Sequence, residues 1–289
     1  MTVKLQTLMN KVEMDVTYSY SEQDSMLYAM AIGMGRDPLN SMELDFVYER
    51  LGRLRVVPTQ SITVARHNLI YDIGLDLDRL LHCEQTVRIH NPLPVRGSLV
   101  ANQRVMSVTD KGKERGILIE TESSVRLADS NTPLFDLRDL FFAKGDGGVG
   151  SFGKINKSTV DMPNREPDIV CFTESEPWQA LLYRTAVGDR SGIHAELGIA
   201  QRAGFDRPIL HGSCTLAIAC REVLINVCNY DVNRFGSFAA CYTAVAYPGE
   251  RFETHIWVTD DIVQFRCNVP ARHSTVLDCG YVRLVPSRI

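Results

Sequence analysis

The segment Gly-Asp-Arg-Ser-Gly-Ile-His at residues 188–194 places a carboxylate, Asp189, and an imidazole, His194, five residues apart in a turn that contains two glycines. On such a turn both side chains can converge on one small molecule, where a carboxylate and an imidazole are suited to move protons. Spacing alone does not establish this chemistry, because an Asp and a His in a polar loop are commonly surface groups.

A second candidate feature is Gly212, which immediately precedes a predicted helix over residues 213–228. The first turn of a helix has unsatisfied backbone N–H groups and the positive end of the helix dipole. Such a turn can stabilise a developing negative charge, and a glycine lets a substrate approach the backbone closely. The adjacent His211 has two interpretations, a structural hydrogen-bonding group or a substrate contact.

The surrounding elements predict a fold that encloses this helix. Its apolar residues recur at i, i+3, i+4 and i+7 and extend around most of its surface, which favours burial. Runs rich in Val, Ile, Thr and aromatic residues predict antiparallel strands. They cover residues 237–245, 251–258, 262–269 and 276–284, with comparable runs at 86–90, 99–108 and 116–127. A long helix wrapped by antiparallel strands is the hot-dog arrangement, an α+β fold.

An internal repeat predicts two such units. Residues 27–33 and 182–188 share Leu, Tyr, Ala and Gly at an offset of 155. We expect a first hot dog over residues 1–149, a linker over 150–170 and a second hot dog over 171–289. In the first unit, residues 58–65 carry β-branched side chains and little helical period, so we expect no full central helix there. The space it would have filled could hold the apolar part of a ligand.

Composition and spacing exclude several classes of protein. The net charge of −4 gives no electrostatic footprint for nucleic acid, and no apolar run approaches the roughly 18–20 residues of a membrane span. The N-terminus carries no recognisable secretory signal, so we expect free buried thiols in a reducing compartment, with Cys214 packed rather than nucleophilic. We expect no metal and no cofactor. Five histidines show no metal-ligand spacing with a carboxylate or cysteine, and we interpret them as structural or surface residues: His67, His82, His90, His255 and His273.

One further motif has a weak functional interpretation. Residues 145–150 fit G-x-G-x-x-G, which binds a dinucleotide only where it opens a helix after a strand. The residues that follow are poor helix formers, so we interpret the motif as a turn.

Several motifs together resemble the (R)-specific 2-enoyl-CoA hydratases, also called MaoC-like dehydratases. The second half carries the Asp-x₄-His segment, Ala-Gly-Phe-Asp-Arg-Pro-Ile-Leu-His-Gly at residues 203–212, Asp-Val-Asn-Arg-Phe at 231–235 and Tyr-Pro-Gly-Glu at 247–250. In the first half, residues 27–33, 46–49 and 57–59 are similar to the degenerate first hot dog of double-hot-dog members. The likeness is to the hydratase part of peroxisomal multifunctional β-oxidation enzymes and their bacterial relatives.

The resemblance implies hydration of a trans-2-enoyl-CoA to a (3R)-hydroxyacyl-CoA. It implies that Asp189 and His194 hold and activate the water and that the backbone N–H of Gly212 is the oxyanion donor. Ser191, Gly192 and His211 are then expected to contact the substrate. At the offset of 155 the first half has Met34 in place of the Asp and Pro58 near the position of the glycine, so we expect one active site per chain.

The sequence departs from the family pattern G-D-x-N-P-x-H at two positions, where Ser191 replaces Asn and Gly192 replaces Pro. Either the loop is remodelled for a bulky acyl group, long, branched or sterol-derived, or activity is weakened. These departures leave a non-catalytic acyl-CoA-binding protein as one alternative. A thioesterase is another, because hot-dog folds also host thioesterases, although the Asp-x₄-His loop speaks against it.

The expected partner is an acyl-CoA thioester, without nucleic acid or membrane, and a homodimer is possible. We expect a cytoplasmic location in a bacterium or a peroxisomal one in a eukaryote. The last three residues, Ser-Arg-Ile, imitate a peroxisomal address weakly.

Overall fold

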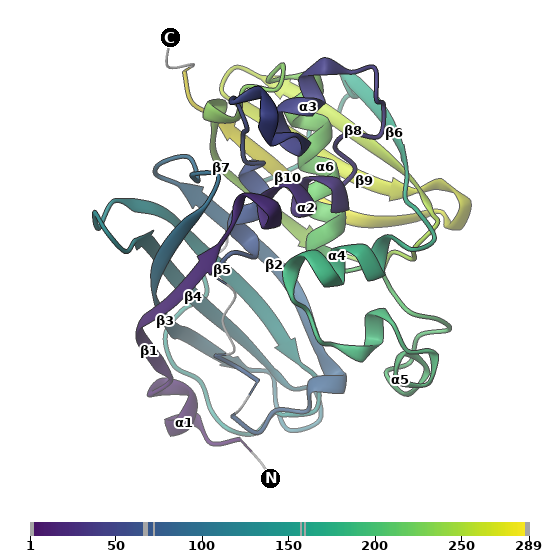
Figure 1. Ribbon diagram of the computed structural model, residues 1–289. Helices are drawn as coiled ribbons and strands as arrows, with labels where there is room; N and C mark the ends of the chain where they lie inside the picture. The colour runs from purple at the N-terminus through teal and green to yellow at the C-terminus, as the bar shows by residue number, and fades with distance from the viewer. Residues whose placement is uncertain (1–2, 66–68, 72, 157, 159, 287–289) are drawn as a thin grey trace.

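The computed structural model describes residues 3–65, 69–71, 73–156, 158 and 160–286, so the C-terminal Ser-Arg-Ile lies outside the described residues. Its centre is one antiparallel sheet of ten strands (Figure 1). The strands are β1 (Val12–Tyr20), β2 (Leu80–Ile89), β3 (Gly97–Asp110), β4 (Ile117–Leu127), β5 (Pro133–Ala143), β6 (Ile169–Glu174), β7 (Phe235–Tyr242), β8 (Arg251–Thr259), β9 (Ile262–Val269) and β10 (Ser274–Leu284).

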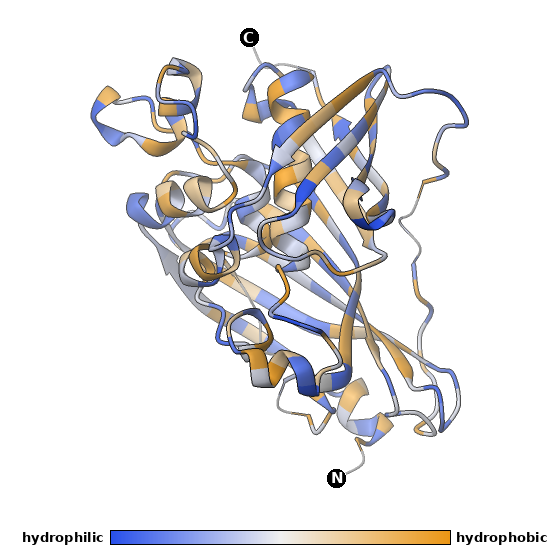
Figure 2. Cartoon of the chain, turned by 90° about the vertical axis from the view of Figure 1, so that its right-hand side faces the viewer, coloured by the Kyte–Doolittle hydropathy of each residue, from blue (hydrophilic) through white to orange (hydrophobic). Residues whose placement is uncertain are grey.

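The order of the strands confirms the predicted duplication. It runs β1-β3-β4-β5-β2 in the first half and β7-β10-β9-β8-β6 in the second, so each half has the same order read from its outer edge. The halves join where β2 pairs with β7, with Glu84 opposite Cys241 and Arg88 opposite Ser237. Along the strands, hydrophobic and hydrophilic residues alternate in bands, as expected for a sheet with one face buried (Figure 2).

The α-helices cover one side of this sheet. They are α1 (Leu5–Met9), α2 (Glu22–Ala31), α3 (Ser41–Val47), α4 (Gln179–Val187), α5 (Leu197–Arg202) and α6 (Gly212–Asn226). The predicted central helix is α6, and its residues from Cys214 to Leu224 are all buried. No helix among the described residues is long and apolar enough to cross a membrane.

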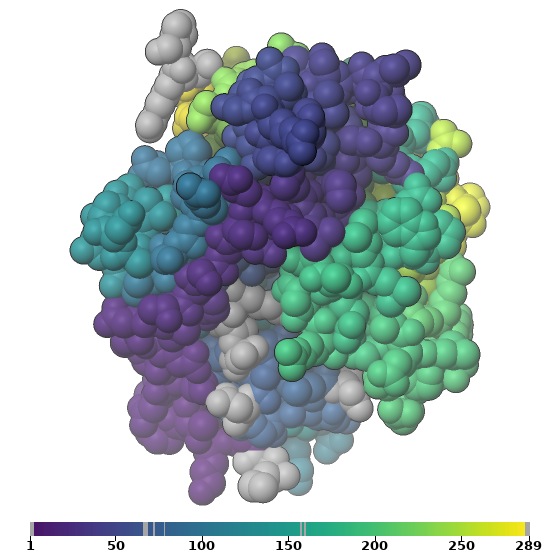
Figure 3. Space-filling view, viewed as in Figure 1, coloured from purple at the N-terminus to yellow at the C-terminus, as the bar shows by residue number. Residues whose placement is uncertain are grey.

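The repeated segments form α2 and α4, which pack against each other. Figure 3 shows their regions side by side on one face. Their repeated tyrosines, Tyr28 and Tyr183, are fully buried with ring centroids 5.9 Å apart. The repeated glycines, Gly33 and Gly188, both adopt positive φ at the end of their helix, a conformation that glycine adopts without strain.

The first half has no counterpart of α6 among its described residues. Between residues 56 and 79 these form two short 3₁₀ helices, η2 (Pro58–Ile62) and η3 (Leu77–Arg79). The prediction of a missing central helix is confirmed. Pro58 lacks a backbone N–H, and the β-branched residues after it disfavour an α-helix.

Strand β5 was not among the predicted runs, and neither were β1 and β6. The latter two lie at the outer edges of the sheet, where one side has no neighbouring strand. The first two residues of β6 fall in the predicted linker, and its exposed side carries Val170 and Phe172, so its sequence lacks the expected polar alternation. Pairing with β8, which is distant in sequence, determines that β6 is a strand.

The glycines at residues 145–150 form a turn that binds a carboxylate of the chain itself. Asp110 accepts hydrogen bonds from the backbone N–H groups of Gly112, Gly148 and Gly150, which lower its pKa. The described residues between this turn and α4 contain no helix. The turn interpretation is therefore confirmed.

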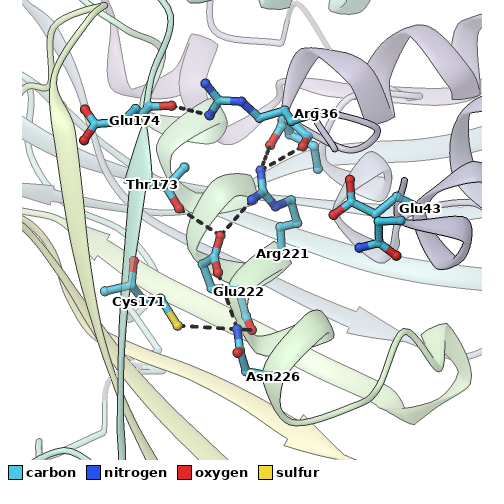
Figure 4. A network of polar contacts seen from close by, with 12 residues as sticks. Arg36, Glu43, Cys171, Thr173, Glu174, Arg221, Glu222 and Asn226 are labelled. Carbon is cyan, nitrogen blue, oxygen red and sulfur yellow. Dashed lines mark hydrogen bonds and ion pairs between the residues drawn. The ribbon is translucent and has the colours of Figure 1, made fainter. Parts of the chain in front are cut away.

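A buried polar network links α6 to the end of α2 (Figure 4). Arg221 donates to the carbonyl oxygens of Ile32 and Gly33, both at 3.0 Å, and pairs with Glu222 at 3.0 Å. Glu222 also accepts a hydrogen bond from Thr173 on β6. The central helix of the second half is thus fixed to the first half by a paired charge.

Candidate active site

The chain directs Asp189 inward at the end of α4. Helix α4 stops at Gly188, whose φ of 65° is left-handed, and the N–H of Asp189 donates to the carbonyl of Arg184. The side chain of Asp189 is buried, and its Oδ1 accepts a 2.6 Å hydrogen bond from the backbone N–H of Ser191. This local turn, of the kind that Asp side chains favour, fixes the carboxylate.

His194 is held by the segment that leads into α6. Its Nδ1 lies 2.9 Å from the carbonyl oxygen of Ile209, and the N–H of Ile209 donates in turn to the carbonyl of Ile193. A neutral imidazole must donate from Nδ1 to such a carbonyl, so Nε2 carries its lone pair. Two hydrogen bonds therefore hold residues 193–194 against Ile209, in the segment before α6.

His211 lies inside the same cluster. Its ring stacks on that of His194 with centroids 3.5 Å apart, and its Nε2 lies 3.7 Å from Oδ2 of Asp189. On another side it meets the ring of Tyr183 at 5.0 Å. The Asp-x₄-His pattern does not reveal this arrangement, because His211 comes from the segment before α6.

Gly212 is the first residue of α6. Within the described part of the chain its backbone N–H has no protein acceptor, so it remains available to a ligand. A Cβ at this position would lie 3.0 Å from the ring of Tyr242, which closes the space beside the glycine. The backbone N–H at the helix start is thus open to a ligand, and the ring of Tyr242 packs against the same residue.

The two departures from the family pattern have different local environments. The side chain of Ser191 is exposed, and its backbone N–H, which any residue but proline would supply, binds Asp189. At Gly192 a Cβ would overlap Cδ1 of Ile199 on α5. The glycine is therefore matched to a neighbour that occupies the space of a larger residue.

A cavity of about 90 Å³ extends from this cluster into the first half. Asp189 and Ser213 line it on one side. On the other side it is lined by residues of the first half together with one residue of α4: Ile62, Thr63, Tyr71, His82, Gln85, Leu137, Asp139 and Val187.

Sequence reasoning missed the polar members of this wall and treated His82 as structural. Asp139 lies on the inward face of β5 together with Leu137 and Phe141. The alternation of residues along this strand could therefore have indicated that Asp139 is buried. His82 gives no such signal, because the β-bulge between His82 and Glu84 changes the face on which it lies.

One group of three side chains among the described residues has the composition of a metal site. The ligand atoms of Asp189, His194 and His211 lie within 4.8 Å of one another. Ligand atoms that share a zinc ion at 2.0–2.2 Å lie roughly 3.4 Å apart and point at a common centre. Two stacked imidazoles do not point that way, so the geometry suits a bound water better than a metal.

Cys214, two residues beyond Gly212, is fully buried, and burial raises its pKa far above the usual range of a thiol. Desolvation thus outweighs the effect of the helix N-terminus. The prediction that Cys214 is packed in the core is confirmed, and all eight cysteines are free.

Comparison with known proteins agrees with this architecture, which defines a double hot dog of the MaoC-like class. Residues 18–145 match the family model of the MFE-2 hydratase 2 N-terminal domain, and residues 156–277 match that of the MaoC like domain. The chain belongs to the enoyl-CoA hydratase 2 family, as its motifs predicted.

Relatives of similar length are found across eukaryotes and bacteria. The chain is 34% identical to the peroxisomal enoyl-CoA hydratase 2 of Arabidopsis thaliana, covering 93% of this chain and 91% of the relative. It is 32% identical to the enoyl-CoA hydratase ChsH3 of Mycobacterium tuberculosis, covering 94% and 95%. A MaoC-like dehydratase of Phytophthora capsici superposes with a TM-score of 0.85 at 28% identity, covering 99% of both chains.

Proposed function

We propose that this protein hydrates a trans-2-enoyl-CoA to a (3R)-hydroxyacyl-CoA in β-oxidation, reversibly and as a hydro-lyase. The observation that carries the proposal is the convergence of Asp189, His194 and His211 next to the start of α6, beside a cavity that Asp189 and Ser213 line. Related proteins named as enoyl-CoA hydratases support the same reaction.

In the proposed reaction the oxygen of water attacks C3 while Asp189 accepts its proton. His194 orients the water through Nε2, since Nδ1 is engaged by the carbonyl of Ile209. The electrons of the double bond move through C2 to the thioester oxygen, where the N–H of Gly212 stabilises the charge. The Asp189–His194 pair returns the proton to C2, so that the water is added across the double bond and the carboxylate is regenerated.

The two halves have different tasks in this proposal. Residues 171–289, after a linker over 150–170, perform the chemistry, and residues 1–149 accommodate the acyl tail. The cavity reaches the part of the first half where the central helix is replaced by η2, which supports a long, branched or otherwise bulky acyl group. Ser191, Gly192 and His211 contact the substrate around the reacting atoms. The chain acts in the cytoplasm of a bacterium or in a peroxisome of a eukaryote, and it can assemble as a homodimer.

The test is a spectrophotometric assay with short, long, branched and sterol side-chain trans-2-enoyl-CoAs. Loss of the conjugated-thioester absorbance measures hydration, and a stereospecific dehydrogenase assigns the configuration at C3. Asp189→Asn and His194→Gln should each lower kcat by about 10²–10⁴-fold, the usual contribution of a positioned acid or base.

Matched controls are Asp206→Asn and His273→Gln, which change exposed residues outside the cluster and should leave kcat unchanged. A wild-type protein that binds enoyl-CoA without hydrating it would identify an acyl-CoA-binding protein. Release of free CoA would identify a thioesterase. Full activity in Asp189→Asn would remove this carboxylate from the mechanism.

A further inference from the structure

The wall of the cavity opposite the active site carries a polar cluster that the proposed reaction does not use. Nε2 of His82 lies 3.0 Å from Oδ1 of Asp139, and the amide nitrogen of Gln85 donates to the same oxygen at 2.8 Å. All three residues line the cavity. Asp139 is 5% exposed, so a buried carboxylate faces the space assigned to an acyl chain.

The neighbours hold this cluster in one arrangement. The hydroxyl of Tyr242 donates to the amide oxygen of Gln85 at 2.8 Å, which directs the amide N–H group at Asp139. The ring of His82 stacks on Phe141 with centroids 4.7 Å apart and meets Tyr242 at 4.8 Å. A carboxylate, an imidazole and an amide in fixed positions form a preorganised hydrogen-bonding surface.

Tyr242 also places the cluster relative to the reaction. The same ring closes the space beside Gly212, so one tyrosine ring and one hydrogen bond separate the oxyanion donor from Gln85. An acyl chain whose thioester oxygen is bound at Gly212 therefore passes the cluster a few bonds beyond C3.

A purely alkyl chain is a poor ligand for such a wall. Covering His82 and Asp139 with methylene groups would remove water from them without replacing its hydrogen bonds, which is unfavourable. A hydroxyl group would accept from the imidazole and donate to the carboxylate. Asp139 and Asp189 line one cavity, and no Lys or Arg is among its described lining residues, so a carboxylate on the chain would be repelled.

We propose that His82 and Asp139 form a subsite for a neutral hydrogen-bonding substituent, a hydroxyl group, on the acyl chain a few carbons beyond the double bond. The proposal rests on the hydratase function proposed above and names a substrate class for it. Gln85 and Tyr242 act as positioning residues that orient Asp139.

The test compares trans-2-octenoyl-CoA with its 5-, 6-, 7- and 8-hydroxy derivatives and with the chain that ends in a carboxylate. For the wild-type protein we expect kcat/KM to be 10- to 100-fold higher for at least one hydroxylated chain and lowest for the carboxylate. In His82→Leu and Asp139→Leu the preference should disappear, because activity on the hydroxylated chain falls at least tenfold while octenoyl-CoA reacts as well or better.

The chain provides a matched control. His90, the residue after β2, forms a 2.8 Å pair with Asp136 on β5, and neither residue lines the cavity. Asp136→Leu should leave the substrate preference intact. Asp139→Asn, which keeps the volume of the side chain, replaces Asp139→Leu if that variant does not fold.

The outcomes separate the two proposals. Equal kcat/KM for octenoyl-CoA and every hydroxylated chain overturns the subsite and leaves the hydratase function standing. If the wild-type protein hydrates none of these substrates, the hydratase proposal fails. Calorimetric binding of octanoyl-CoA and hydroxyoctanoyl-CoA then tests the subsite alone, and equal Kd values overturn it. A purely structural role of the pair would lower activity on both chains equally in the Leu variants.

Discussion

At the scale of single residues, Gly192, which replaces the family proline in the loop of residues 188–194, fits the side chain of Ile199 beside it. A Cβ at Gly192 would overlap the end of the Ile199 side chain, which fills that space from α5. Overpacking of this kind displaces the local backbone. The displaced segment would carry His194, two residues further on.

We therefore predict that Gly192→Ala lowers kcat/KM for enoyl-CoA about tenfold and destabilises the fold by about 1 kcal/mol, the low end of the cost of overpacking. Adding Ile199→Val removes Cδ1 and should restore most of both losses, whereas Ile199→Val alone should have little effect. Enzyme kinetics and urea unfolding measure the two quantities. Wild-type kinetics in Gly192→Ala would show that the loop does not depend on this contact.

The candidate site could be predicted from sequence to the extent that it is local. Asp189, His194 and Gly212 stand in recognisable motifs, and their segments meet in the structure. His82 and Asp139 could not be placed in the same way. Their meeting depends on a bulge in β2 and on pairing between strands more than fifty residues apart, which no single motif records.

At the scale of elements, the contact between α6 and the turn after α2 depends on the absence of a side chain at Gly33. Its φ of 93° lies in the region that glycine favours, and a Cβ would overlap the guanidinium of Arg221. Because Arg221 is buried and paired with Glu222, its displacement leaves a buried charge without full compensation.

Gly33→Ala should therefore cost about 3–4 kcal/mol of stability, of which about 1–2 kcal/mol is the backbone term for a left-handed alanine. Gly112→Ala is the control, because its φ of 101° is similar and nothing lies within 4 Å of the added Cβ. It should show the backbone term alone. Equal losses of unfolding free energy in urea for the two variants would contradict the role assigned to Arg221.

The elements themselves could be predicted unequally. Helix α6 and the four strands after it have strong internal periodicity, and the structure differs from their predicted bounds by a few residues. The edge strands β1 and β6 have no strong periodicity of this kind. Pairing with β3 and β8, which are distant in sequence, determines that they are strands.

At the scale of the whole molecule, the buried thiols relate stability to pH. Burial raises the pKa of Cys171 and Cys228 to about 11 and of Cys241 and Cys267 to about 12. An unfolded chain loses these protons near pH 8.5, whereas the folded protein keeps them. Their contribution to stability is therefore complete below about pH 8.5 and decreases as the pH rises toward 11–12.

We predict that the urea midpoint falls steadily between pH 8.5 and 10.5. Cys267, which is fully buried, should account for up to about 1.4 kcal/mol per pH unit, the value for one proton. The Cys267→Ala variant should be less stable at pH 7.5 but show a shallower slope above pH 8.5. An unchanged slope in that variant would mean that the alkaline loss has another source.

The single ten-stranded sheet makes this chain a pair of hot dogs within one polypeptide, whose halves meet where β2 and β7 pair through backbone hydrogen bonds. In an assembly of two identical chains, every mutation appears twice, so removing the central helix for extra room would also remove the backbone N–H at the helix start from both copies. Joining the copies in one polypeptide lets selection act on each separately. One half could lose its helix start to Pro58 and evolve toward recognition, while the other kept the inherited chemistry.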